Sequence, residues 1–422
     1  MTLWAKLHHP KTYIRAFLKW ALLGILIGGL GGLLGAGFHH TLHFVTHVRG
    51  EHSWLIFLLP VGGLLTVLWY RLLRLQSNRG TNEIIDAALD GHFVSPLVAP
   101  GIFVATSMTH LFGGSAGREG AALQLGGSMA SLLGKLFKLK LQDRKLLIMS
   151  GMSAVFAGLF GTPLTACLFT MMFESVGTIF SPALLPCYLA AYTASTVSGM
   201  LGVHAETFLL EITIDLSLNS LWRLVALAVA IALLGNLMCR LFHEAEHQAA
   251  KWFPNRAMRI LVGACLIVGM TLLVGDHRFN GAGMDMALQA VGGQTDWYSF
   301  LLKMLFTAIT LSAGFKGGEI VPTFCIGATF GCLLGGLLGL DAGITAALGL
   351  VGLFCCATNS PLASIVLSVE MFGTTNLYLF ALICVICAVL SGRTGLYSSR
   401  NLNTSQSAFL GENNREKKTP AQ

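Results

Sequence analysis

The sequence has little charge for its length. Only 11% of its 422 residues are charged and 54% are hydrophobic, whereas a soluble domain carries about 25% charged residues. This excludes a soluble enzyme, a disordered chain and a protein that binds nucleic acid through a basic surface. Apolar runs extend from Ala16 to Leu390, which also excludes a single anchor on a soluble domain. We therefore expect a polytopic membrane protein in contact with lipid, without a nucleic-acid partner.

Other features are missing as well. No Gly-rich phosphate-binding loop with a Lys is present, which disfavours transport driven by ATP. The first apolar run is followed by His39 and His40 and not by small residues, so no cleaved signal peptide is predicted. The ten cysteines do not suggest disulfides, because several lie inside apolar runs as small hydrophobes. None of these patterns implies a cofactor.

One cluster has the appearance of a metal site. His39, His43 and His47 lie four residues apart, which places them on one helical face. No Cys or carboxylate joins them before Glu51. The favoured interpretation is a helix end at the membrane interface, with no bound metal.

The apolar runs differ in length. A spanning helix needs about 20 residues, and four runs reach or approach this: 16–37, 54–73, 221–241 and 260–274. Others are short or interrupted by Gly or Pro: 97–112, 121–136, 146–160, 163–173, 320–338 and 361–372. Hydrocarbon does not tolerate unpaired backbone, so we expect an all-α fold whose broken helices meet around an internal cavity.

Basic residues flank this apolar region. They are Lys6, Lys11, Arg15 and Lys19 at its start, and Arg415, Lys417 and Lys418 after its end. The positive-inside rule then places both termini in the cytoplasm. The expected organisation is a cytoplasmic segment 1–15, a transmembrane domain 16–410 and a disordered tail 411–422, with polar linkers including 139–145, 242–255 and 275–296.

The 49 glycines fall into two kinds of cluster. Those in 24–37 are expected to let helices pack closely. Those in 113–120 and 314–318 form a weak internal repeat: Gly117-Arg118-Glu119-Gly120 corresponds to Gly317-Gly318-Glu319-Ile320. Further on, residues 160–164 are echoed by 358–362, and Pro163 and Pro361 each open a helix. Two such breaks in corresponding positions predict a transporter site at the interface between the repeats.

The chemistry expected at these breaks is anion binding and proton transfer. Helix N-termini present unpaired N–H groups and about half a positive charge, so several that converge bind an anion. Glu119 lies in one break; ionised it can occupy the anion site, and protonated it can leave with a proton. A capping salt bridge with Arg118 is the structural alternative. Glu319 is either a second buried carboxylate, with Lys316 near it, or a cap on its own helix. Glu370 suits a structural hydrogen bond at least as well.

Gly117 to Gly120 resembles the Gly-Arg/Lys-Glu-Gly signature of the CLC chloride channel and transporter family. Residues 317–322 resemble its second signature, and Tyr397 resembles its anion-binding tyrosine. The chain departs from the family pattern in both signatures, with Ala121 in place of Pro and Ile320 in place of Phe. Arg79 stands in place of the chloride-binding Ser, and Thr81 is the nearest hydroxyl. Phe173, which follows Met172, stands in place of the inner proton-transfer Glu. They resemble the fluoride-exporting branch of the family.

The resemblance implies a CLC-like inverted repeat of tilted and broken helices, forming a dimeric fluoride/proton antiporter with one pore per subunit. It implies Glu119 as the gate, Glu319 on a possible proton path, and an anion site from Gly80, Thr81, Gly117, Arg118, Gly120, Gly318, Ile320, Val321 and Tyr397. The expected location is a bacterial plasma (inner) membrane. A chloride/proton antiporter or chloride channel remains open, and so does a membrane-embedded enzyme with Glu119 and Glu319 as paired carboxylates.

Overall fold

The computed structural model describes residues 10–77, 79–173, 181–205, 207–208, 210, 213–215, 217–392 and 394–397. The expected tail 411–422, most of segment 1–15, and Glu174, a carboxylate next to the Phe173 position, lie outside the described residues.

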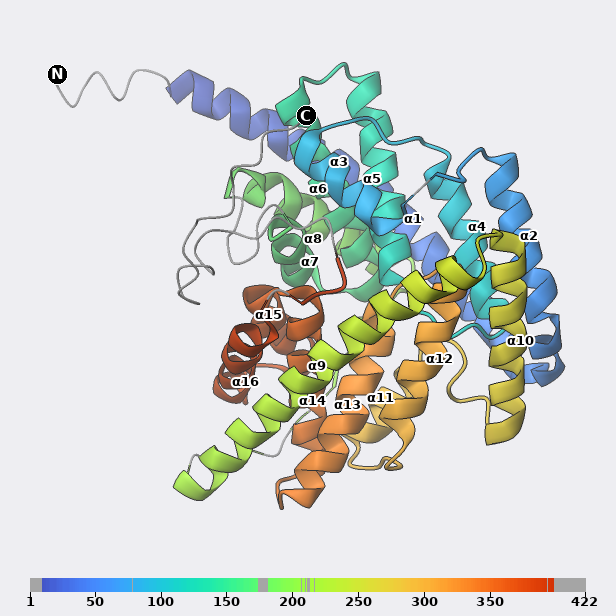
Figure 1. Ribbon diagram of the computed structural model, residues 1–422. Coiled ribbons are helices and arrows are strands. Elements are labelled where there is room, and N and C mark those ends of the chain that lie inside the picture. Colours follow the sequence, from blue (N-terminus) through green and yellow to red (C-terminus); the bar gives the residue numbers. More distant parts are fainter. Residues whose placement is uncertain are drawn as a thin grey trace, which may run out of the picture.

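The described part of the chain is helical, as predicted (Figure 1). The first half contains α1 (Pro10–Glu51), η2 (Ser53–Leu58), α2 (Leu59–Leu72), α3 (Thr81–Asp90), α4 (Val98–Leu111), α5 (Glu119–Leu136), α6 (Leu141–Phe160), α7 (Pro163–Met171), η3 (Ser181–Ala183) and α8 (Leu184–Met200). The second half contains α9 (Leu218–Trp252), α10 (Arg256–Val274), α11 (Met284–Val291), α12 (Ser299–Ala313), α13 (Ile320–Leu337), α14 (Ala342–Thr358), α15 (Pro361–Phe372) and α16 (Leu377–Ser391).

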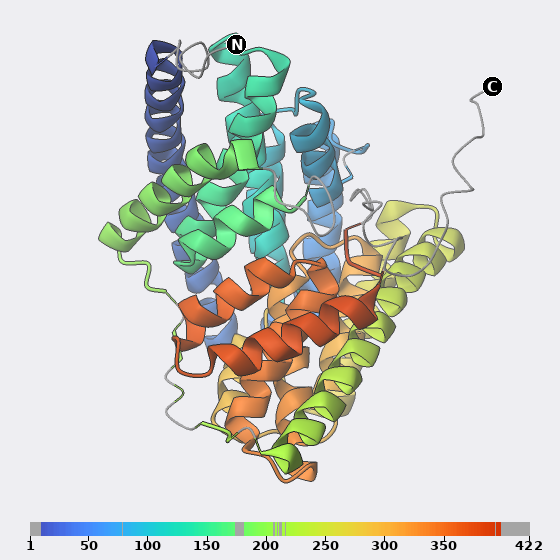
Figure 2. The same ribbon diagram turned by 90° about the vertical axis from the view of Figure 1, so that its left-hand side faces the viewer.

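Among the residues that the structure describes, five stretches are long and apolar enough to cross a membrane: Tyr13–Glu51, Ser53–Leu72, Leu218–Trp252, Arg256–Val274 and Ile320–Leu337. Several others are shorter, including α4, α12 and α15. The division into long and short helices therefore follows the sequence prediction. Figure 2 shows the short helices α7 and α15 lying obliquely to the long α1, a tilted arrangement.

The expected linkers were partly wrong, because hydropathy marks where a helix leaves the apolar region and not where the helix ends. α9 continues through most of 242–255, where Gln248 donates a hydrogen bond to Glu244 one turn earlier (2.5 Å). α6 begins at Leu141 inside the expected linker 139–145, and α11 lies inside 275–296. Polar side chains one turn apart support a helix that projects beyond the membrane.

The two halves are built alike. In each, the helix that follows the Gly-rich break packs against the next helix, α5 on α6 and α13 on α14. Both crossings are made at glycine: a side chain on Gly126 would overlap the Gly151 carbonyl, and one on Gly327 would overlap the Gly349 carbonyl. The Pro-opened helices α7 and α15 then pack against each other across the halves. The internal repeat in the sequence is thus a structural repeat.

The glycines in 24–37 pack helices, as expected. A Cβ on Gly28 would lie 2.6 Å from the Ala190 carbonyl oxygen of α8, and one on Gly31 would lie 2.6 Å from Ala154 Cβ of α6. Glycine therefore brings α1 against both helices at backbone distance, the close approach that small residues permit in membranes.

Candidate ion pathway

The two Gly-rich breaks meet in the middle of the fold. Gly117 N–H donates to the Gly318 carbonyl (2.7 Å), and Gly318 N–H donates to the Gly117 carbonyl (2.8 Å). α5 begins at Glu119 and α13 at Ile320, each two residues after its bridge residue. The bridge therefore brings together two helix N-termini from opposite halves, and with them Gly117, Gly120, Gly318, Ile320 and Val321. This is the convergence of partial positive charges that favours an anion.

The Glu119 side chain occupies this convergence. It is fully buried, and neither carboxylate oxygen has a hydrogen-bond partner among the described residues. Oε2 lies so close to Gly117 and Gly318 that a Cβ on either glycine would collide with it. A small cavity between Glu119 and the rings of Phe156, Phe160 and Phe324 adjoins the carboxylate. Glu119 thus stands where an anion would bind, close to the backbone N–H groups of Arg118, Glu119 and Val321.

The Arg118 guanidinium forms no hydrogen bond with the Glu119 carboxylate among the described residues. Its guanidinium lies 4.9 Å from the centroid of the Phe160 ring and 3.4 Å from His39 Nδ1. Within the described part of the chain, the salt bridge between Arg118 and Glu119 that the sequence offered as an alternative is therefore absent.

Two cavities approach the Glu119 loop. The first, which we name the outer vestibule, has a volume of about 700 Å³ and is lined by Arg118 and Val321 together with Arg49 and His43. The second, the inner vestibule, has a volume of about 180 Å³ and is lined by Gly120. Arg118 lines one cavity and Gly120 the other, so the backbone at Glu119 passes between the two, while the Glu119 side chain borders the small apolar cavity. The two vestibules therefore approach the Glu119 loop from different sides.

The inner vestibule collects most of the remaining predicted site residues: Gly80, Thr81, Gly318, Glu319 and Tyr397. Thr81 Oγ1 lies 3.4 Å from the Gly120 carbonyl oxygen, and Gln124 Nε2 donates to both that carbonyl (3.1 Å) and Thr81 (3.3 Å). Arg79 instead forms an ion pair with Asp86 (2.5 Å). The hydroxyl that reaches the loop therefore comes from Thr81.

Tyr397 reaches the pathway from the far end of the chain. Its backbone is tethered through the adjacent Leu396, whose N–H donates to the Ala357 carbonyl (2.8 Å). Its ring meets Phe173 edge to face at 5.6 Å between centroids. Phe173, the position of the missing inner glutamate, is thus a fully buried packing partner of the tyrosine.

Glu319 is half-buried in the inner vestibule and does not cap α13 through its side chain. Lys316 lies over the Tyr70 ring at 4.8 Å and forms no ion pair with Glu319 in the described part of the chain. Glu119 and Glu319 share no hydrogen bond here. Glu119 borders the small apolar cavity and Glu319 the inner vestibule, so the two carboxylates face different cavities.

Glu370 has the structural role considered from the sequence. Its carboxylate accepts hydrogen bonds from the backbone N–H groups of Leu164 (2.8 Å) and Thr165 (2.9 Å). It therefore caps α7 from α15, across the two halves. Neither Thr162 nor Ser360 caps its own helix.

The histidines of α1 lie within the helix and not at its end, because α1 continues to Glu51. The His39 and His43 rings are stacked 6.5 Å apart, and His43 and His47 line the outer vestibule. Among the described residues no group of three or more His, Cys, Asp or Glu is placed to hold a metal ion.

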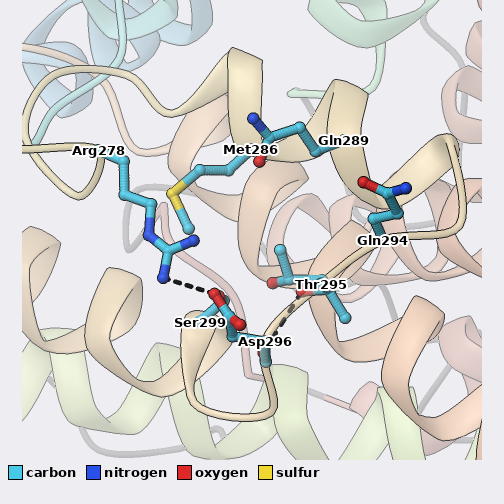
Figure 3. A pocket seen from close by; sticks show the side chains of 8 residues that line it. Arg278, Met286, Gln289, Gln294, Thr295, Asp296 and Ser299 are labelled. Carbon is cyan, nitrogen blue, oxygen red and sulfur yellow. Dashed lines mark hydrogen bonds and ion pairs between the residues drawn. The ribbon is translucent and has the colours of Figure 1, made fainter. Parts of the chain in front are cut away.

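A side pocket of about 260 Å³ opens beside the outer vestibule, with which it shares Arg278, Met286 and Gln289 (Figure 3). Arg278 forms ion pairs with Asp296 (2.5 Å) and Asp276 (2.8 Å). These two carboxylates neutralise the one guanidinium, so the side pocket is a poor anion site, and none of the predicted site residues lines it.

Sequence reasoning missed Lys303, which secures the first break. This α12 lysine is fully buried, and its ammonium donates to Ser115 Oγ (2.9 Å) and to the carbonyls of Phe279 (3.1 Å) and Gly281 (2.7 Å). One and two turns on, Thr307 Oγ1 bonds Ser115 Oγ (3.0 Å) and Thr310 Oγ1 accepts from Ser115 N–H (3.0 Å). The spacing Lys303, Thr307, Thr310 on an otherwise apolar helix was the available signal, since these positions share one face.

Lys303→Met is expected to loosen this loop. The substitution leaves the buried carbonyls of Phe279 and Gly281 without this donor, each costing about 1–3 kcal/mol, whereas Ser115 Oγ keeps its bond to Thr307. We expect a lower unfolding temperature and slower anion efflux from liposomes. The matched control Lys140→Met removes an exposed lysine at the start of α6 and should leave both unchanged. Wild-type stability and efflux in Lys303→Met would show that the lysine does not hold the loop.

Comparison with known proteins tests the resemblance. Residues 62–393 match the family model described as voltage gated chloride channel. The chain belongs to this family, the CLC family. It is 35% identical over 395 residues to a chloride/fluoride channel protein of Pseudomonas syringae pv. tomato, covering 92% of this chain and 87% of that protein. A solved structure of a CLC-type fluoride/proton antiporter has 33% identity and a TM-score of 0.88, covering 92% of this chain and 98% of that one.

More distant members are also similar to this CLC chain. An H(+)/Cl(-) exchange transporter of Vibrio vulnificus is 27% identical over 443 residues, covering 92% of each chain. A slow cyanobacterial Cl-/H+ antiporter of solved structure has a TM-score of 0.75 at 21% identity, which compares the folds only. The predicted fold, a CLC-like all-α membrane protein, is confirmed.

Proposed function

We propose that this CLC protein is a secondary transporter, and not an enzyme, that exports fluoride in exchange for protons. The observation that carries the proposal is the buried Glu119 carboxylate, which lies against two helix N-termini and whose neighbours Arg118 and Gly120 line the two vestibules. A buried carboxylate at such a position is functional by default, because its burial is costly.

The geometry supplies a way to couple the two ions. The ionised carboxylate and an anion compete for the same helix N-termini, so they do not occupy the site together. When an anion takes the site, Glu119 leaves it, and a protonated carboxyl is the form that suits the apolar cavity beside Phe156, Phe160 and Phe324. Each exchange of anion for side chain is thereby linked to a change in protonation.

The groups that line the inner vestibule favour fluoride over chloride. Fluoride is small and strongly hydrated, so a site must replace its water with close donors. Thr81 Oγ1 lies beside Gly120, and glycine at 117, 120 and 318 leaves the backbone uncovered by side chains. The chloride/fluoride protein of Pseudomonas syringae and the fluoride/proton antiporter of known structure support this choice of ion.

The proton route passes through Glu119 and Glu319. Phe173 and the adjacent Met172 are buried and cannot relay a proton. Glu319 borders the inner vestibule, where a Glu119 side chain that swings inward would meet it. We therefore expect Glu319→Gln to impair proton uptake under a fluoride gradient, while Glu174→Gln leaves coupled transport nearly intact. A coupled Glu319→Gln protein, or an uncoupled Glu174→Gln protein, would contradict this route.

The assembly we propose is a homodimer with a complete pathway in each subunit, because one chain supplies both vestibules and the gate. It lies in a bacterial inner membrane with both termini in the cytoplasm, as the flanking basic residues indicate.

The proposal is tested with purified protein in liposomes. An outward fluoride gradient should drive protons into liposomes against a proton gradient, recorded together with fluoride release. Fluoride release without uphill proton movement would indicate a channel. Absence of anion flux would contradict the function as a whole.

A further inference from the structure

An apolar groove lies on the outside of the molecule, apart from the ion pathway. It has a volume of about 360 Å³ and lies between α9 and α10, with residues of α12 at its base. Its walls are formed largely by apolar side chains, among them Leu241, Phe253, Leu266 and Ile309. α12 packs against both α9 and α10, so the groove is a fixed feature of the helix arrangement.

One end of the groove is basic. Arg259 lines it, and the exposed Lys251 and Arg256 lie at the same turn between α9 and α10. Arg259 Nε is buried and has no hydrogen-bond partner among the described residues. In the same part of the chain, no carboxylate forms an ion pair with Arg259, Lys251 or Arg256. Glu244 also lines the groove, but its carboxylate accepts a hydrogen bond from Gln248. The basic end therefore retains N–H donors for a ligand.

We propose that this groove binds a phospholipid with an anionic headgroup. An acyl chain lies along the apolar walls, and the headgroup phosphate contacts Arg256 and Arg259. A guanidinium presents paired donors that match phosphate oxygens, and Lys251 adds positive charge. Trp252, 70% exposed at the same turn, is typical of the membrane interface where headgroups lie. A phospholipid has an apolar chain and a charged head that match the two ends of the groove.

The bound lipid also acts on transport, a step that rests on the proposed function. Ser312 lines both the groove and the inner vestibule. α12 ends one residue later, and the second Gly-rich break begins at Gly314. Arg259 reaches this glycine: its Nη2 lies 3.9 Å from the point that a Cβ on Gly314 would occupy. A phosphate on Arg259 fixes this arginine against the loop that leads to Gly318. Anionic lipid thereby orders the inner side of the anion site.

Lipid binding is measured first, independently of transport. Protein in detergent is mixed with equal amounts of phosphatidylglycerol and phosphatidylcholine, and retained lipid is counted by native mass spectrometry. We expect wild type to prefer phosphatidylglycerol by at least about fivefold and Arg256→Gln/Arg259→Gln to lose this preference. Ala249→Trp, which fills the groove without changing charge, should retain less of both lipids. The control Lys138→Gln/Lys140→Gln removes two exposed lysines elsewhere and should behave as wild type.

Transport is measured second, in vesicles of phosphatidylcholine with and without phosphatidylglycerol. Fluoride efflux by wild type should rise on the order of threefold with the anionic lipid, and the double arginine variant should not respond. An unchanged lipid preference in the double variant, or an equal loss in the lysine control, would overturn the binding site. Selective binding with no effect on efflux would overturn the coupling to the Gly314 loop, while lack of fluoride efflux in every vesicle would contradict the proposed function instead.

Discussion

Glu119→Gln is expected to abolish the coupling between proton and fluoride movement. Glutamine has the size of glutamate but cannot exchange a proton. The native carboxylate lies against Gly117 and Gly318 at two helix N-termini, where its charge competes with that of an anion. A neutral amide neither competes electrostatically nor carries a proton, so anion flux should stop or become uncoupled. Proton uptake driven by a fluoride gradient should fall to the level of protein-free liposomes.

The measurement records internal pH and external fluoride in the same liposomes. Glu51→Gln is the matched control, because it removes an exposed carboxylate at the end of α1 that, within the described part of the chain, pairs with His47 at 3.7 Å. This control should transport as wild type does. Uphill proton movement at the normal rate in Glu119→Gln would show that another group is the gate.

Fluoride efflux is expected to exceed chloride efflux by at least about tenfold, which requires only ~1.4 kcal/mol of discrimination. A site that removes water from fluoride must supply short contacts from several donors. Here the convergent helix N-termini, the Thr81 hydroxyl and Tyr397 border the same inner vestibule. A wider site would leave the smaller ion poorly coordinated and would favour chloride.

The selectivity is read from liposomes loaded with either ion at the same concentration, using an ion-selective electrode for each. Protein-free liposomes correct for leakage, including passage of undissociated hydrogen fluoride. Equal efflux of the two ions would assign this chain to the chloride-transporting members of the family.

The sequence predicted most of the helices near the lengths they have. The short runs at 163–173 and 361–372 became α7 and α15, and the long run at 260–274 lies within α10. The errors lie where polar residues continue a helix beyond the membrane, as in the last part of α9. Hydropathy reports the surroundings of a helix, whereas backbone hydrogen bonds decide where it ends.

The candidate site was predictable in its parts but not in all its contacts. Gly-Arg-Glu-Gly and its weak repeat pointed to Glu119 and to the two helix starts. The fully buried Lys303 was missed because its partners, Ser115, Phe279 and Gly281, come from two loop segments that are distant from it in the sequence. Glu370 caps α7 through Leu164, which lies 206 residues earlier in the sequence. This contact likewise depends on how the two halves pack.

By itself the sequence determined that this protein is a membrane transporter with broken helices and a carboxylate at one break. Composition and periodicity are local properties, and a signature of four residues is local too. Only the tertiary structure decided that Gly117 bonds Gly318, that Thr81 and not Arg79 reaches the loop, and that Glu119 and Glu319 border different cavities. These facts depend on how two halves of one chain close on each other, because an anion site made of helix N-termini exists only after those termini converge.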